Sequence, residues 1–229
     1  MDGQFHAGGG ADWSLDEAVI RELDAIIGPD VRSLETGAGR STIEIVRRGA
    51  THTAVTPSAS EIQLLRAALA EESIDASRLT FVEGYSQDVL PGLTGELDFV
   101  LIDGGHGFPI PQVDWTYTAP RLRVGGHLMI DDVDLWTGKI LVDFLKEDPK
   151  WEFVRLIRGR TVLFKLVRAF TFDEWSEQPF VARRSKGGQT RRKLVNALGH
   201  LAHGEVDVLL KKFRHDRDLA AARGRPSGD

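Results

Sequence analysis

Three aspartates and one histidine stand where two apolar runs of the sequence end. Asp103 follows the first run, and Asp131 and Asp132 follow the second. If these runs are neighbouring parallel strands, which lie about 4.8 Å apart, the carboxylates meet and repel one another unless a cation lies between them. Such hard oxygen ligands favour Mg²⁺ or Ca²⁺. The alternative is that Asp131 or Asp132 merely caps the next helix, which accounts for one aspartate and not for three.

His106 lies three residues after Asp103. Imidazole titrates closest to neutral pH among side chains, so it can take the proton of a hydroxyl group. A cation bound to the same hydroxyl makes that proton easier to lose. We therefore interpret His106 and Asp103 as candidate catalytic residues, with a purely structural hydrogen bond from His106 as the alternative.

A short Gly-containing segment after the first apolar run is a candidate ligand-binding loop, because residues without Cβ let the backbone approach a ligand closely. A phosphate-binding loop would need Lys where Arg40 stands, and a dinucleotide-binding loop would need Gly where Thr42 stands. S-adenosylmethionine remains, and its cationic sulfonium and ammonium groups suit a carboxylate in the loop. The residues expected at this ligand are Glu35, Thr36, Gly37, Ala38, Gly39 and Ser41.

An alternation of strands and helices must position these residues. Apolar runs predict strands at 31–36, 52–56, 79–82, 97–102 and 127–130. Helical spacing covers 41–48, and two capping boxes, Ser14 with Glu17 and Ser58 with Glu61, predict further helix starts. Alternating elements of this kind imply right-handed crossovers and a parallel sheet.

The end of this region changes character. Strand-like runs at 151–157 and 161–167 are joined by Arg-Gly-Arg, which predicts a β-hairpin. We therefore predict an α/β fold with a doubly wound, mostly parallel sheet, a C-terminal antiparallel hairpin and a helical C-terminal extension.

Two domains are expected: a cofactor-binding domain at 1–169 and a basic, partly helical extension at 170–229. The extension carries 12 Lys and Arg against 8 Asp and Glu, a net charge of +4, so the rest of the chain carries −9. Within the extension we predict an irregular stretch over 170–189, with a loop at 185–188, and helical content over 191–222.

Composition narrows the classes of protein. The chain has 229 residues, of which 41% are hydrophobic, and no apolar run approaches the roughly 18 residues of a membrane span. It contains no Cys, which excludes disulfides, thiolate catalysis and Cys-bound metals. The acidic domain is a poor surface for nucleic acid. We expect a cytoplasmic protein with no membrane or nucleic-acid partner, and we leave a homodimer open.

Residues 34–42, Leu-Glu-Thr-Gly-Ala-Gly-Arg-Ser-Thr, resemble motif I of the class I S-adenosylmethionine-dependent methyltransferases. The resemblance extends over roughly 31–167 and implies the Rossmann-like methyltransferase fold. Segments 84–91 and 135–138 further resemble the divalent-metal-dependent O-methyltransferases of the catechol, caffeoyl-CoA and macrolide-sugar types.

That resemblance implies roles for individual residues. Ser86 and Gln87 would face the adenine of the cofactor. Asp103 would lie beside the cofactor, and with Asp131 and Asp132 it would hold Mg²⁺ or another divalent cation. The resembling enzymes have Asp-Asn at the second place, whereas this sequence has Asp-Asp.

One of the resembling positions varies among these enzymes, and at another this sequence departs from them. Where His106 stands, catechol and caffeoyl-CoA enzymes have Lys and macrolide-sugar enzymes have His. The second strand should end in an acid that binds both ribose hydroxyls, but here it ends in Thr56, a weaker, neutral partner.

The expected function is S-adenosylmethionine-dependent O-methylation of a small hydroxylated acceptor, assisted by a divalent cation. The missing acid motivates an alternative, a catalytically weak or inactive binding or regulatory protein on the same fold. A methyltransferase for macromolecules, guided by the basic extension, is the third hypothesis.

Overall fold

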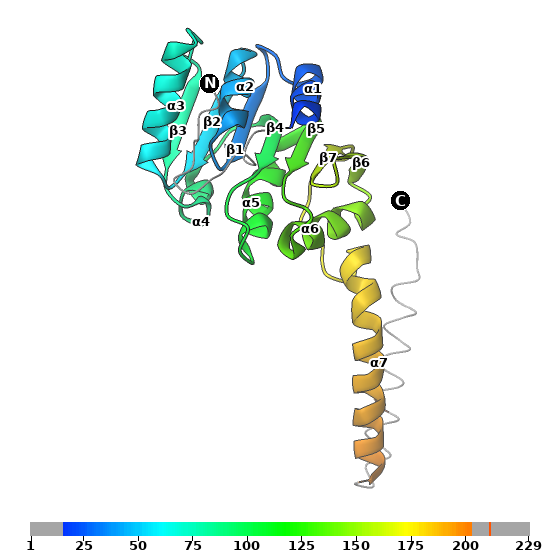
Figure 1. The fold of residues 1–229 in the computed structure, drawn as a ribbon. Helices are drawn as coiled ribbons and strands as arrows, with labels where there is room; N and C mark the ends of the chain where they lie inside the picture. Colours follow the sequence, from blue (N-terminus) through cyan, green and yellow to red (C-terminus); the bar gives the residue numbers. More distant parts are fainter. Residues whose placement is uncertain (1–15, 203–210, 212–229) are drawn as a thin grey trace. The chain divides into compact units, whose positions relative to one another are not determined.

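The computed structural model describes residues 16–202 and residue 211 (Figure 1). The chain divides into two compact units, Met1–Asp173 and Glu174–Asp229. The first unit contains the sheet, and its strands are β1 (Arg32–Thr36), β2 (Thr51–Thr56), β3 (Leu79–Glu83), β4 (Leu97–Ile102), β5 (Leu122–Ile130), β6 (Trp151–Ile157) and β7 (Thr161–Leu166). Its helices are α1 (Glu17–Ile26), α2 (Arg40–Arg47), α3 (Ala59–Glu71), α4 (Ser86–Val89), α5 (Ile110–Thr118) and α6 (Trp136–Glu147), with short 3₁₀ helices η2 (Leu90–Gly92) and η3 (Ala119–Arg121).

The seven strands form one sheet in the order β3-β2-β1-β4-β5-β7-β6. Strands β1 to β5 pair in parallel, and β7 pairs antiparallel with both β5 and β6. The predicted fold class, a mostly parallel doubly wound sheet of the Rossmann-like methyltransferase type with a C-terminal hairpin, is thereby confirmed. Because the first five strands are parallel, their carboxyl ends lie at one edge of the sheet, where ligands bind in such folds.

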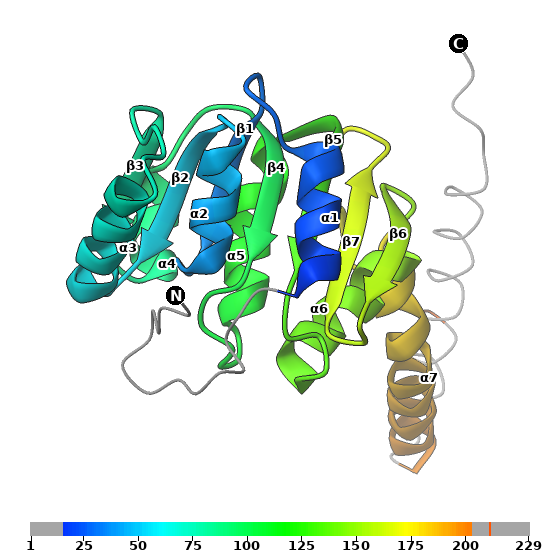
Figure 2. The same cartoon turned by 45° about the horizontal axis from the view of Figure 1, so that its top comes forward.

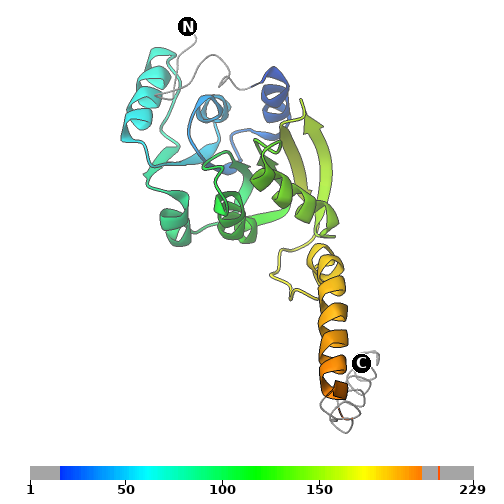
Figure 3. The same cartoon turned by 60° about the horizontal axis from the view of Figure 1, so that its bottom comes forward.

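Helices cover both faces of the sheet, with α1, α2 and α3 on one face and α4, α5 and α6 on the other (Figures 2 and 3). Strand β4 is buried throughout, as predicted for a central parallel strand. Its side chains alternate between the two cores: Phe99 and Leu101 pack with α1, whereas Val100 and Ile102 pack with α6. The same alternation decides which residues of β1 and β2 reach which face.

Several element boundaries differ from those predicted. Strand β5 starts at Leu122, five residues early, because Leu122 pairs with Leu97 before the register shifts and pairing resumes at His127. Ser14 lies outside the described residues, and the side chain that caps α1 is that of Asp16, which accepts from Ala18 N. Only half of the predicted box at α3 forms: Ser58 Oγ accepts from Glu61 N at 3.2 Å.

The second unit contains helix α7 (Pro179–Ala202), which corrects two predictions for the extension. The helix begins within the stretch 170–189 that was predicted to be irregular, and it runs through the predicted loop at 185–188. The two glycines of that predicted loop, Gly187 and Gly188, cost about 1 kcal/mol each relative to Ala, which the Lys, Arg and Gln residues around them, good helix formers, offset. Over residues 16–202, no helix is long and apolar enough to cross a membrane.

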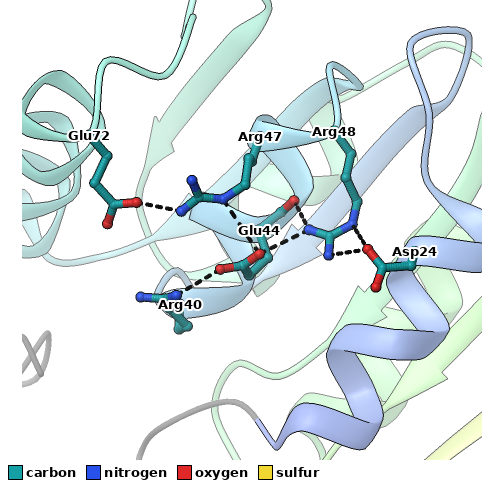
Figure 4. Close-up of polar contacts among 6 residues, drawn as sticks. All are labelled: Asp24, Arg40, Glu44, Arg47, Arg48 and Glu72. Atoms are coloured by element: carbon teal, nitrogen blue, oxygen red, sulfur yellow. Dashed lines mark hydrogen bonds and ion pairs between the residues drawn. The ribbon is translucent and has the colours of Figure 1, made fainter.

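A cluster of charged side chains connects α2 to its neighbouring helices (Figure 4). Glu44 on α2 is almost fully buried and forms ion pairs with Arg40 at 2.9 Å and Arg48 at 3.0 Å, and a looser one with Arg47 at 3.6 Å. Arg48 also pairs with Asp24 of α1, and Arg47 pairs with Glu72, just after α3. The cluster fixes the helix that follows the Gly loop.

Candidate active site

A cavity of 880 Å³ opens at the carboxyl edge of the sheet. It is lined by segments that follow each of the first five strands, together with the start of α1 and the β6–β7 turn. The predicted site residues that line it are Thr36, Gly37, Ala38, Gly39, Ser41, Thr56, Ser86, Gln87, Asp103, His106 and Asp131. Glu35 and Asp132 do not line it.

Gly37 explains why the loop needs glycine. Its φ is +87°, and a Cβ there would lie 2.2 Å from the carbonyl oxygen of Asp103. Any other residue would therefore clash with the loop after β4 and strain the backbone. Gly37 N donates to Val55 O at 2.9 Å, which fastens the loop to β2.

Glu35 is fully buried and points away from the cavity toward α2, because alternation along β1 places it on the opposite face from Thr36. Its carboxylate accepts from Ser41 Oγ at 2.6 Å and from Thr42 Oγ1. Thr42 Oγ1 in turn accepts from Gly39 N at 3.0 Å. Glu35, predicted to lie beside the cationic cofactor, instead anchors the Gly loop through its bonds to Ser41 and Thr42.

A buried histidine extends this network, and it was not predicted. His52 Nε2 lies 3.1 Å from Glu35 Oε1, and its Nδ1 lies 2.8 Å from Ser33 Oγ. A neutral imidazole that donates from Nε2 and accepts from the Ser33 hydroxyl satisfies all three side chains. The sequence signal was present, because His52 occupies an inward position of β2, but its partner on β1 depends on the register.

The segment after β3 presents Ser86 and Gln87 to the cavity at the start of α4. This segment adjoins the end of β2, because Gly84 N donates to the Thr56 carbonyl at 3.0 Å, and Thr56 Oγ1 donates to Glu61 Oε2 at 2.8 Å. Glu61 also lines the cavity and was not among the predicted site residues.

The three predicted aspartates are brought together at the ends of β4 and β5. Burial, and then the nearby Asp131 carboxylate, raises the pKa of Asp103 well above its usual range. Burial also raises the pKa of Asp131, against the hydrogen bond from Thr161. Capping of the next helix does not explain these residues, because α6 begins at Trp136, has Leu135 at its N-cap and receives no capping side chain.

Asp132 adopts a left-handed backbone conformation with φ of 51°. This conformation is uncommon outside Gly and Asn, although Asp tolerates it better than most residues. Gly138 on α6 makes room for it, since a Cβ there would lie 2.8 Å from the Asp132 carbonyl oxygen. The turn directs the Asp132 carboxylate to His106, whose Nε2 lies 3.0 Å from Oδ2.

The loop that carries His106 is held from α6. Thr137 Oγ1 donates to the His106 carbonyl at 2.6 Å, and Gln112 Nε2 donates to the Thr137 carbonyl at 2.8 Å. His106 itself is partly exposed and lines the cavity. Its imidazole is therefore oriented by a carboxylate on one side and accessible to a ligand.

Two residues of the hairpin complete the acidic end of the cavity, and the sequence did not reveal them. Arg160 Nε lies 2.6 Å from Asp132 Oδ1 and 3.6 Å from Asp131 Oδ2. Thr161 Oγ1 donates to Asp131. The Arg-Gly-Arg turn was visible as a hairpin signal, but its position next to β5 follows from a strand order that no local pattern encodes.

The donor set can be compared with what a divalent cation requires. One ligand atom each from Asp103, His106 and Asp132 lie within 4.8 Å of one another. Two carboxylates and an imidazole in one small space suit such an ion, so these residues fit it. Asp131, predicted as the third ligand, is not part of this group, and His106 takes its place.

Another buried carboxylate lies behind the loop after β4. Asp114 on α5 is fully buried, and neither of its oxygens has a hydrogen-bond partner of good geometry. Burial raises the pKa of Asp114, while the nearby Ser86 and Thr36 hydroxyls act against the shift. Asp114 lies close to Gly104, because a Cβ on that glycine would be 3.4 Å from its Oδ2.

The central part of the chain matches a known protein family. Residues 34–133 match the family described as a methyltransferase domain. The match covers less than half of the chain and includes the Gly loop, Asp103 and the two aspartates that follow β5. No curated protein matches the sequence.

Solved structures share the fold. A cofactor-bound protein from MTB is 20% identical with a TM-score of 0.56, covering 67% of this chain and 82% of its own. The O-methyltransferase TomG from Streptomyces achromogenes, in complex with SAM, is 17% identical with a TM-score of 0.55, covering 66% and 79%. An SAH-bound methyltransferase from Podospora anserina is 18% identical with a TM-score of 0.55, covering 69% and 82%. At these identities the likeness establishes the fold alone.

Proposed function

We propose that the chain transfers the methyl group of S-adenosylmethionine to a hydroxyl group of a small molecule. The observation that carries this proposal is that His106, oriented by Asp132, lines the same cavity as the Gly loop. A methyl acceptor bound between them has a general base at its hydroxyl and the cofactor on its other side.

The cofactor would bind along the Gly loop, with Ser86 and Gln87 at its adenine. Gly37 and Gly39 let the backbone approach it closely, and Ser41 stands at the start of α2, where free N–H groups favour a carboxylate such as that of the cofactor's methionine moiety. Most of the rate would come from holding the methyl donor and the acceptor oxygen in line.

The acceptor's proton would pass to His106. If Nε2 donates to Asp132, then Nδ1 is the nitrogen that accepts the proton, and the Asp132 carboxylate stabilises the imidazolium that forms. Arg160 balances the charge of Asp131 and Asp132 and keeps both carboxylates in place.

Asp103, His106 and Asp132 are also the residues that would hold a divalent cation such as Mg²⁺. When bound, such an ion supplies Lewis acidity to an acceptor hydroxyl. His106 would then be a ligand rather than the base, so metal dependence and the role of His106 are tested together.

Methyl transfer from S-adenosylmethionine to a panel of catechols and sugar hydroxyls tests the proposal, with and without EDTA and added Mg²⁺. His106→Gln is expected to lower kcat by about 10²–10⁴-fold, the usual contribution of a general acid or base. Asp143→Asn, an acid on α6 that pairs with Lys139 outside the cavity, is the matched control and should leave kcat unchanged. Turnover that survives His106→Gln would refute the assigned base, and turnover that survives EDTA would refute the metal.

A further inference from the structure

Glu61 lies in the cavity near the end of strand β2, where an acid for the ribose hydroxyls of the cofactor was expected but Thr56 stands. Helix α3 follows β2 directly, and Glu61 stands in its first turn. Glu61 lines the cavity together with Pro57 and Ser58 and with the segment of Gly84 to Gln87, which follows the neighbouring strand β3. Thr56 itself, the last residue of β2, has only a hydroxyl to offer.

The carboxylate of Glu61 is turned toward Thr56 rather than into a capping box. In a complete box it would accept from Ser58 N. Instead, Ser58 N donates to Thr56 Oγ1 at 3.3 Å, and Thr56 Oγ1 donates to Glu61 Oε2 at 2.8 Å. Ser58 Oγ holds the Glu61 backbone N–H at 3.2 Å, so the start of the helix and the direction of the side chain are both fixed.

The other carboxylates that line the cavity belong to other segments of the chain than Glu61 does. Among its described lining residues, the other carboxylates are Asp16 at the start of α1, Asp103 after β4 and Asp131 after β5. Glu61 is the carboxylate of the β2–α3 segment. In nucleotide-binding α/β folds, an acid about 20 residues beyond the Gly loop, at the end of the second strand, accepts hydrogen bonds from ribose. Glu61 stands at that distance from Gly39 along the chain.

We propose that Glu61 is the ribose-binding carboxylate of this chain, with Thr56 as the residue that positions it. The bond from the Thr56 hydroxyl orients the Glu61 carboxylate and takes one of the roughly four acceptor sites that an ionised carboxylate offers. The ribose of the methyl donor can therefore bind an acid that arises from the helix instead of the strand. The inference rests on the assignment of the chain as an S-adenosylmethionine-dependent methyltransferase.

The test is calorimetric binding of S-adenosylhomocysteine and of its 2′-deoxy and 3′-deoxy counterparts. Glu61→Gln keeps the shape of the side chain and removes its charge. We expect this substitution to weaken the binding of S-adenosylhomocysteine by about 10- to 100-fold, the range for losing hydrogen bonds to a charged group. The same substitution should change the binding of the deoxy compounds much less, because they have already lost a ribose partner.

Two variants separate ribose recognition from a merely structural effect. Thr56→Val leaves Glu61 in place but unguided, and it should weaken binding by a smaller factor. Glu71→Gln removes an exposed carboxylate from the last turn of the same helix and should leave binding unchanged. If Glu61→Gln acted only by removing a favourable negative charge from the start of the helix, it would lower stability and would affect S-adenosylhomocysteine and its deoxy counterparts equally.

The outcomes distinguish failure of the ribose assignment for Glu61 from failure of the methyltransferase assignment for the chain. If the unaltered chain binds S-adenosylhomocysteine and Glu61→Gln binds it equally well, the ribose assignment is wrong and the methyltransferase assignment stands. An equal loss for all three compounds would also overturn the ribose assignment. If the unaltered chain binds none of them at millimolar concentration, both assignments fail.

Discussion

Thr42→Val tests whether the Gly loop is held from behind by Glu35. The substitution preserves the shape of a fully buried, β-branched side chain and removes only the hydroxyl. That hydroxyl accepts from Gly39 N and donates to Glu35 Oε1, so two hydrogen bonds are lost at once.

The expected cost follows from these two bonds. A hydrogen bond to a charged group contributes about 1.5–3 kcal/mol and a neutral one about 0.5–1.5 kcal/mol. Since neighbouring contributions do not simply add, we expect Thr42→Val to lower the free energy of unfolding by about 2–4 kcal/mol. For a chain of this size that corresponds to a fall in Tm on the order of 10 °C.

Thr118→Val is the matched control, because Thr118 is equally buried and helical but its hydroxyl donates only to a carbonyl of its own helix, that of Asp114, at 2.7 Å. It should cost about 0.5–1.5 kcal/mol. Urea-induced unfolding followed by circular dichroism compares the two variants, and binding of S-adenosylhomocysteine should weaken for Thr42→Val alone. Equal stabilities for the two variants would refute the claim that Glu35 and Thr42 anchor the loop.

Two further changes probe buried charges. Because burial raises the pKa of Asp114, the folded state keeps its proton to higher pH than the unfolded chain, and stability falls as pH rises from about 4 through the raised pKa. Asp114→Asn should therefore stabilise by about 1–3 kcal/mol at pH 7 and by little at pH 4; urea titrations at both pH values that gave the same difference would contradict this. Glu44→Gln should destabilise by about 1–2 kcal/mol in the same assay, because three arginines lose a buried partner, whereas Glu72→Gln at the exposed edge of the cluster should cost less than about 1 kcal/mol.

The parts of the fold that the sequence predicted are those encoded over short distances. The apolar run of β4 ends at Asp103 as predicted, and the Gly loop follows β1, because strand periodicity and turn chemistry are local properties. The same local rule could not say which face of β1 carries Glu35. The face of β1 that carries Glu35 depends on where α2 packs, and in the structure the Glu35 carboxylate lies in the core, bonded to Ser41 and Thr42 of α2.

The acidic end of the cavity was predictable only in part. Asp103 and Asp132 were recognised as strand-end carboxylates, but Arg160 and Thr161 reach them from a hairpin whose place in the sheet depends on pairing with β5. Glu61 was visible as a helix-capping residue, and the bond from Thr56 that redirects it depends on three-dimensional contacts. Non-local pairing, rather than residue type, decided these outcomes.

The strand order β5-β7-β6 has a consequence for synthesis of the chain on the ribosome. Strand β6 is made before β7 but has no partner until β7 is inserted between it and β5. A nascent chain that ends near Ile157 therefore exposes an unpaired edge of β5, a surface prone to aggregation. Since the turn into β7 also carries Arg160 and Thr161 to the carboxylates, closing the sheet and finishing the acidic end of the cavity are one event. An incomplete translation product is expected to have neither.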